Sequence, residues 1–118
     1  MSREFEMLVR ITGFESSRQK NIEKACCSEW PFEAENFSTE TGANDTRILT
    51  TRAMDSLYAG ESEEEFTDRL AMAIWKANQG YCEVEVQALY LEELPYEQHV
   101  REEDNYQRLM KKAANGGE

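Results

Sequence analysis

Residues 62–91 read SEEEFTDRLAMAIWKANQGYCEVEVQALYL, and two regular patterns follow one another within them. The first half predicts a helix over 63–78, because Ser62 and Glu65 have the spacing of a capping box and a glycine follows the last turn. The second half, 81–91, alternates apolar and polar residues with the period of two that a half-buried strand needs. A helix followed at once by a strand indicates an α–β unit in which the helix packs on a sheet.

The rest of the chain shows the same two periodicities. Alternation predicts a strand over 4–12, and a capping-box pattern at Ser16 and Gln19 predicts a helix over 17–29. The other expected elements are strands over 32–41 and 47–53 joined by a hairpin loop, a connector over 54–60 that tucks Met54, Leu57 and Tyr58 under the domain, and a helix over 102–113.

This order of elements predicts an α+β fold, a ferredoxin-like βαββαβ sandwich with an antiparallel sheet, two helices on one face and an added C-terminal helix. The last strand would lie at one edge of the sheet, beside the first. Leu8, Leu89 and Leu91 would then face water on the open side of the sheet. We expect the C-terminal helix to cover part of that open side with its apolar stripe, Tyr106, Leu109 and Met110.

Size and charge limit the possible functions. The 118 residues fit one domain, expected over 1–114 with a flexible tail over 115–118. A formal net charge of −11 argues against direct binding to nucleic acid or to an anionic membrane surface. No signal peptide opens the chain, no apolar run approaches the ~20 residues of a membrane span, and the three cysteines form a poor disulfide framework. We therefore expect a cytoplasmic protein.

The negative charge is concentrated in residues 61–104, which hold 13 acidic and 3 basic residues. One interpretation is a solvated surface that keeps an edge strand from pairing with other chains. The other is an electrostatic surface that attracts a basic protein partner. The acidic side chains that would supply this field are Glu61, Glu63, Glu64, Glu65 and Asp68.

The helix over 63–78 has a second unusual feature, because residues 70–75 are apolar on every side. Met72 and Trp75 point away from the stripe that would face the core. Either the 54–60 connector or the 92–101 loop covers them, or they form an apolar contact surface inside an acidic rim. In the second case Trp75 is the anchor of a protein interface.

No catalytic site, metal site or cofactor is predicted. His99 has no second histidine or cysteine at a metal-binding spacing. Cys26 should face inward and Cys27 outward, close to a helix C-terminus, where a thiol is structural rather than nucleophilic. Glu83 and Glu85 share the outer face of one strand and are interpreted as solvated. We therefore expect a protein that is not an enzyme.

The resulting hypothesis is a small acidic module that binds and blocks or regulates a basic protein partner, with a nucleic-acid-binding complex as one candidate. Phages and other mobile elements encode small acidic inhibitors of this kind, including anti-CRISPR and anti-restriction proteins that act as nucleic-acid mimics, and the analogy rests on size and charge. The alternative is a homodimeric ferredoxin-like regulatory module that binds a small ligand. Both a monomer and a homodimer stay open.

Overall fold

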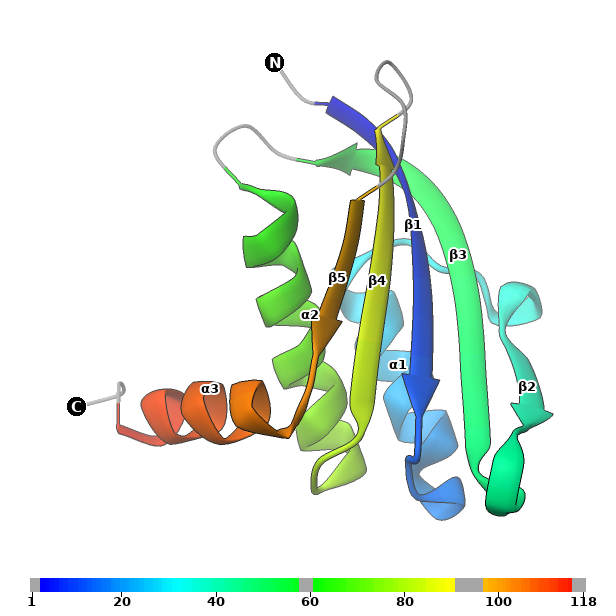
Figure 1. Ribbon diagram of the computed structural model, residues 1–118. Coiled ribbons are helices and arrows are strands. Elements are labelled where there is room, and N and C mark those ends of the chain that lie inside the picture. Colours follow the sequence, from blue (N-terminus) through cyan, green and yellow to red (C-terminus); the bar gives the residue numbers. More distant parts are fainter. Residues whose placement is uncertain (1–2, 58–60, 91–96, 116–118) are drawn as a thin grey trace.

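β1 (Arg3–Thr12) lies in the middle of an antiparallel sheet (Figure 1). The computed structural model describes residues 3–57, 61–90 and 97–115, and the described strands follow the order β2-β3-β1-β4-β5. The other four strands are β2 (Ser38–Thr41), β3 (Arg47–Leu57), β4 (Glu83–Tyr90) and β5 (Glu97–Arg101).

Two helices, α1 (Gln19–Glu29) and α2 (Glu63–Asn78), lie side by side on one face of the sheet (Figure 1). A third helix, α3 (Glu103–Asn115), extends beside α2. The prediction of an α+β fold built on an antiparallel sheet is confirmed. Within the described part of the chain, no helix is both long and apolar enough to cross a membrane.

The core fills the space between this sheet face and the two helices. Alternate side chains of β1 and β4 point into it, as the period of two requires. Ile22 and Cys26 of α1 and Phe66, Leu70 and Ile74 of α2 meet them and are fully buried. The inward side chains of the two central strands are Phe5, Met7, Val9, Ile11, Val84, Val86 and Ala88.

Both ends of α2 are set by local signals. The helix covers the predicted residues, and its capping box between Ser62 and Glu65 is formed. At its C-terminus the left-handed conformation is taken by Gln79, with φ of 60°, instead of Gly80. The Gly80 N–H donates to the Trp75 carbonyl at 3.2 Å, and this bond closes the last turn.

The first helix begins differently from the prediction. Ser16–Arg18 forms one turn of 3-10 helix, α1 starts at Gln19, and the predicted capping box at Ser16 is not formed. A contact from elsewhere in the chain holds this start instead. The Glu15 N–H donates to Oδ1 of Asn78 at 2.8 Å, which ties the entry of α1 to the last residue of α2.

The second strand is shorter than predicted, because Ala34–Asn36 forms a 3-10 turn within the expected range 32–41. The third strand is longer and takes in part of the expected connector. Met54 belongs to β3 and is 62% exposed, so the prediction that it tucks under the domain is wrong. Tyr58, Leu91 and the tail residues 116–118 lie outside the described residues.

The sequence analysis missed β5, which pairs with β4 and moves the sheet edge outward by one strand. The predicted last strand, β4, therefore lies beside β1 but not at an edge. The position of α3 also differs from the prediction. Its apolar stripe packs on the helical side of the sheet, where the Tyr106 ring meets the Trp75 ring at 5.1 Å, and it does not cover the open side.

Candidate functional site

The structure separates the five acidic residues that the sequence grouped together. Glu65 is part of the helix cap, because its carboxylate accepts the Ser62 N–H at 2.9 Å while Ser62 Oγ accepts the Glu65 N–H at 3.1 Å. Glu63 also belongs to the first turn of α2 and is half-buried. Carboxylates at this position stabilise the positive end of the helix dipole. Glu63 and Glu65, two of the residues predicted to attract a partner, therefore also stabilise the start of α2.

Glu61 lies on the side of α2 that faces α1. Arg69 binds it with two donors, at 3.1 Å from Nε and 2.9 Å from Nη2, and reaches Glu29 of α1 with Nη1 at 2.9 Å. The same guanidinium lies over the Phe66 ring at 5.3 Å. One cation thus bridges two carboxylates at this corner and lowers the negative charge that a partner would meet there.

Glu64 and Asp68 lie on the opposite side of α2 and face β5. Arg101 is 8% exposed and donates from Nε to Oδ1 of Asp68 at 2.6 Å. Its Nη2 donates to the Glu64 carbonyl at 3.3 Å and lies 3.7 Å from the Glu64 carboxylate. His99 Nδ1 lies 3.4 Å from Glu64 Oε1. The Glu64 side chain nonetheless stays 72% exposed.

A further group of carboxylates gathers around Tyr81, where β4 and α3 begin. The pKa of Tyr81 is raised, first by partial burial and then by the negative charges of Glu83, Glu102 and Glu103. α3 begins two residues after Arg101, so this group continues the one at Asp68. We call the combined surface the acidic edge, and it consists of Glu64, Asp68, Glu83, Glu102 and Glu103.

The two apolar residues predicted for the partner surface do not form one contact. Trp75 is 1% exposed, its Nε1 donates to the Cys82 carbonyl at 2.7 Å, and Tyr106 of α3 covers it. The interpretation of Trp75 as an exposed anchor is therefore wrong, and the cover comes from α3. Met72 is half-buried and lines a separate surface hollow with Glu29, Arg69, Ala73 and Lys76.

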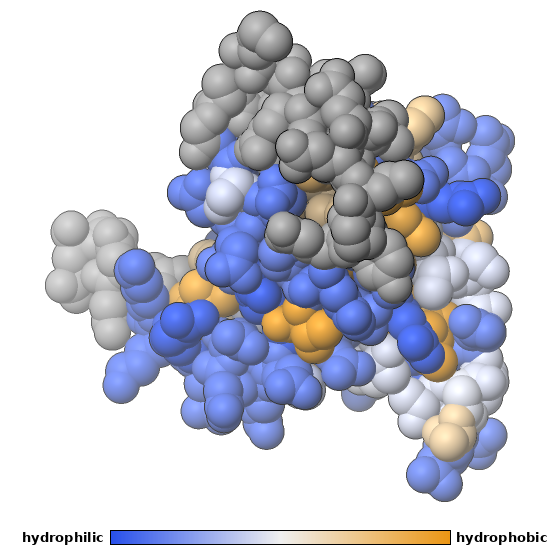
Figure 2. Space-filling view, turned by 45° about the horizontal axis from the view of Figure 1, so that its top comes forward, coloured by the Kyte–Doolittle hydropathy of each residue, from blue (hydrophilic) through white to orange (hydrophobic). Residues whose placement is uncertain are grey.

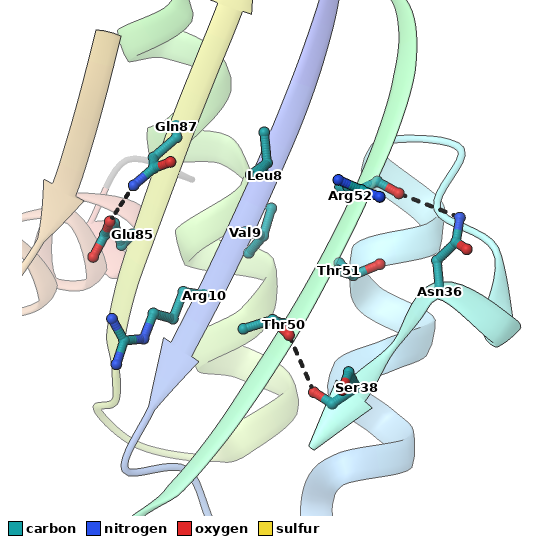
Figure 3. Close-up of a pocket in the computed structure, with 10 residues that line it drawn as sticks. All are labelled: Leu8, Val9, Arg10, Asn36, Ser38, Thr50, Thr51, Arg52, Glu85 and Gln87. Carbon is teal, nitrogen blue, oxygen red and sulfur yellow. Dashed lines mark hydrogen bonds between the residues drawn. The ribbon is translucent and has the colours of Figure 1, made fainter. Parts of the chain in front are cut away.

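The open face of the sheet carries a hollow of about 380 Å³ that the sequence analysis did not identify (Figure 3). We call it the sheet hollow. Its outward-facing lining comes from three neighbouring strands, with side chains at Leu8 and Arg10 of β1, Thr50 and Arg52 of β3, and Glu85 and Gln87 of β4. Alternation placed Leu8 and Glu85 on the outer face, whereas the strand register brings them together with Arg10, Thr50, Arg52 and Gln87.

Thiol and metal chemistry find little support in the part of the chain that the structure describes. No group of three His, Cys, Asp or Glu residues there is placed to hold a metal ion. Burial, and then the nearby Cys27, raises the pKa of the Cys26 thiol far above its ordinary value. Cys27 is exposed, and its Sγ lies 3.2 Å from the Phe32 carbonyl. The predicted inward and outward orientations of these two cysteines are confirmed.

The face shown in Figure 2 is mostly hydrophilic, with hydrophobic residues in small separate patches. Polar and charged groups therefore form the larger part of the described surface on this face. Comparison with models of known protein families, with curated protein sequences and with solved structures finds no match to this chain.

Proposed function

We propose that this chain is a non-catalytic interaction module whose acidic edge binds and blocks or regulates a basic, nucleic-acid-handling protein. The observation that carries the proposal is the gathering of five carboxylates near one strand, β5: two from α2, one from β4, one from α3 and Glu102 from the link between β5 and α3. Arg101 lies within this edge, but it is 8% exposed and so offers little positive charge to a partner. Such a field speeds the association of a basic protein and weakens as salt is added.

The sheet topology supports the same surface. β5 has β4 on one side and no further strand of the described sheet on the other. An open strand edge can add an extended segment of another chain through backbone hydrogen bonds. With Glu64 and Glu102 beside it, this edge would favour a basic segment and repel an acidic one. The carboxylates therefore serve both of the roles considered from the sequence, protection of an edge and selection of a partner.

The test is retention of basic proteins from a host lysate on the immobilised chain, followed by elution with a salt gradient. The variant Glu64→Gln, Glu83→Gln, Glu102→Gln removes three charges from the acidic edge. The matched control, Glu33→Gln, Glu35→Gln, Glu40→Gln, removes three exposed carboxylates near β2, at the other edge of the sheet. Both variants have the same net charge, so a difference between them reports position.

We expect the control to retain the partner and the acidic-edge variant to bind it more weakly, by about tenfold, since each of the three charges contributes roughly 0.2–1 kcal/mol. The recovered complex should no longer bind its nucleic acid. Equal retention by both variants, or retention that salt does not change, would contradict the proposal. A partner that still binds nucleic acid within the complex would contradict the blocking mechanism.

We also infer that β1 to β4 with α1 and α2 form a ferredoxin-like unit to which β5 and α3 are added. The strand order β2-β3-β1-β4 within the sheet supports this inference, as do the two helices on one face. This fold is shared by many unrelated functions, so it carries no part of the functional proposal.

A further inference from the structure

Two arginines, Arg10 and Arg52, line the sheet hollow of this strongly acidic protein. Arg10 faces Thr50 across the β1–β3 pair, and Arg52 is two residues further along β3, so the two guanidinium groups start from diagonal positions. Both side chains are exposed. Diagonal neighbours in an antiparallel sheet lie about 7–8 Å apart, within reach of long side chains. In Figure 3 the Arg10 side chain extends toward β4 and Arg52 stays over β3, so the two guanidinium groups lie apart in this conformation.

Neither arginine forms an ion pair among the described residues, in contrast to Arg69 and Arg101, which bind carboxylates at 2.6–3.1 Å. The carboxylate that lines the hollow is Glu85, which faces Arg10 in the β1–β4 register. Its Oε2 instead accepts amide N–H groups from Gln87 at 3.0 Å and from Gln98 of β5 at 2.8 Å. Figure 3 shows the Glu85 and Gln87 side chains joined on β4, apart from the Arg10 guanidinium.

The other lining groups complete a mixed site. Leu8 is half-buried between Arg52 on β3 and Gln87 on β4 and gives the hollow an apolar part. Ser38 lies at its rim and presents a hydroxyl group. A small apolar surface with a few convergent polar groups is the usual character of a small-molecule site, and about 380 Å³ is near the lower end of the usual volumes.

We propose that the sheet hollow binds a small organic anion, whose phosphate or carboxylate group pairs with Arg10 and Arg52 while its apolar part rests on Leu8. Guanidinium groups bind such oxyanions with two parallel hydrogen bonds, and both arginine side chains are long and exposed, so they can turn toward an anion above Leu8. Because the chain carries a net charge of −11, a small anion needs such a local pair of cations in order to bind.

The occupant is a small molecule and not a nucleic-acid strand. Proteins that bind single strands on a sheet face stack the bases on aromatic side chains. None of the described residues that line the sheet hollow is aromatic. The lining residues of the sheet hollow differ from the five residues of the acidic edge, although Glu83 of that edge is two residues from Glu85, so this inference does not depend on the proposed function.

The test is a titration of the ¹⁵N-labelled full chain at constant ionic strength, followed through backbone amide shifts. Three probes are compared: phenyl phosphate, benzoate and inorganic phosphate. The first two have an apolar body and differ in the oxyanion, whereas inorganic phosphate has no apolar body. We expect saturable shifts at Leu8, Arg10, Thr50 and Arg52, with inorganic phosphate the weakest probe. The tighter of the two aromatic probes identifies the oxyanion that the site prefers.

Arg10→Gln and Arg52→Gln should each weaken binding of that probe about tenfold, because each removes a charge-assisted contact. Arg47→Gln is the matched control, an exposed arginine of β3 outside the hollow, and it should bind like the unchanged chain. Circular dichroism establishes that all three variants fold. Shifts that rise linearly without saturation, that chloride reproduces, or that Arg47→Gln weakens equally would overturn the proposal.

Discussion

The burial of Trp75 can be tested by replacing it with phenylalanine. The indole is 1% exposed, its Nε1 donates to the Cys82 carbonyl at 2.7 Å, and its ring meets the Tyr106 ring at 5.1 Å with an interplanar angle of 88°. Phenylalanine keeps an aromatic ring in this place but has no N–H group and a smaller body. The change therefore removes the hydrogen bond and part of the packing, and leaves the aromatic contact to Tyr106 largely in place.

The expected loss in the free energy of unfolding has two parts. A buried carbonyl that loses its donor costs about 1–3 kcal/mol. The two ring carbons that phenylalanine lacks contribute roughly 0.8 kcal/mol each through burial. The sum is about 3 kcal/mol, which is a large fraction of the 5–15 kcal/mol typical of a domain. If Trp75 were an exposed anchor, the same substitution would change the free energy of unfolding by less than about 0.5 kcal/mol.

Urea unfolding followed by far-UV circular dichroism measures this difference without using tryptophan fluorescence. With a slope of roughly 2 kcal/mol per molar urea, the midpoint should fall by about 1.5 M. Met54→Ala is the control, because Met54 is 62% exposed and its removal should leave the midpoint nearly unchanged. A midpoint for Trp75→Phe that equals that of Met54→Ala would refute the burial of the indole and of its hydrogen bond.

Two further predictions concern buried ionisable groups. Burial raises the pKa of Cys82 from 9.0 to about 12 and also raises that of Cys26, so the folded chain keeps protons that the unfolded chain releases. The contribution of these protonated thiols to the free energy of unfolding should therefore be fully present below pH 9 and decline as the pH rises toward 12. Urea midpoints at pH 7, 9 and 10 should show this decline. In Cys82→Ala the midpoint should fall less steeply with pH. Arg101→Leu should lower the free energy of unfolding by about 1–2 kcal/mol, because a charge-assisted bond to the partly exposed Asp68 is lost. An unchanged urea midpoint for Arg101→Leu would show that this ion pair adds no stability.

The elements that the sequence predicted well are those with signals inside the element. The bounds of α2 are confirmed, because Ser62, Glu65 and the turn at Gln79 and Gly80 lie directly at its two ends. β1 and β4 are confirmed because each is buried on one face only and so alternates cleanly. Such patterns need no knowledge of distant residues.

The strand β5 escaped prediction because its inward face is polar. His99 and Arg101 point toward α2, where they meet the side chains of Glu64 and Asp68 instead of an apolar core. A strand of this kind has no apolar alternation to detect. β5 is held instead by the opposite charge of side chains on α2, such as Asp68, more than 30 residues earlier in the chain. No local sequence pattern reveals such a pairing.

The apolar stripe of α3 was found from its spacing, but the surface that it covers was not. Glu102 alone separates β5 from α3, and this short link keeps the helix beside α2. The candidate site shows the same limit. Glu61 and Glu64 are close in sequence, yet Arg69 binds one on the side of α1 and Arg101 approaches the other on the side of β5.

The contact between α3 and Trp75 determines how long this tryptophan stays exposed during synthesis of the chain. Translation proceeds from the N-terminus, so α2, which contains Trp75, leaves the ribosome before Tyr106 does. Until α3 has been synthesised and has docked, one side of a large aromatic ring has no cover. A nascent chain at this stage, or one cut by a protease between β5 and α3, exposes apolar surface that chaperones and degradation enzymes recognise. Docking of α3 therefore hides an apolar surface that the chain exposes until Tyr106 reaches Trp75.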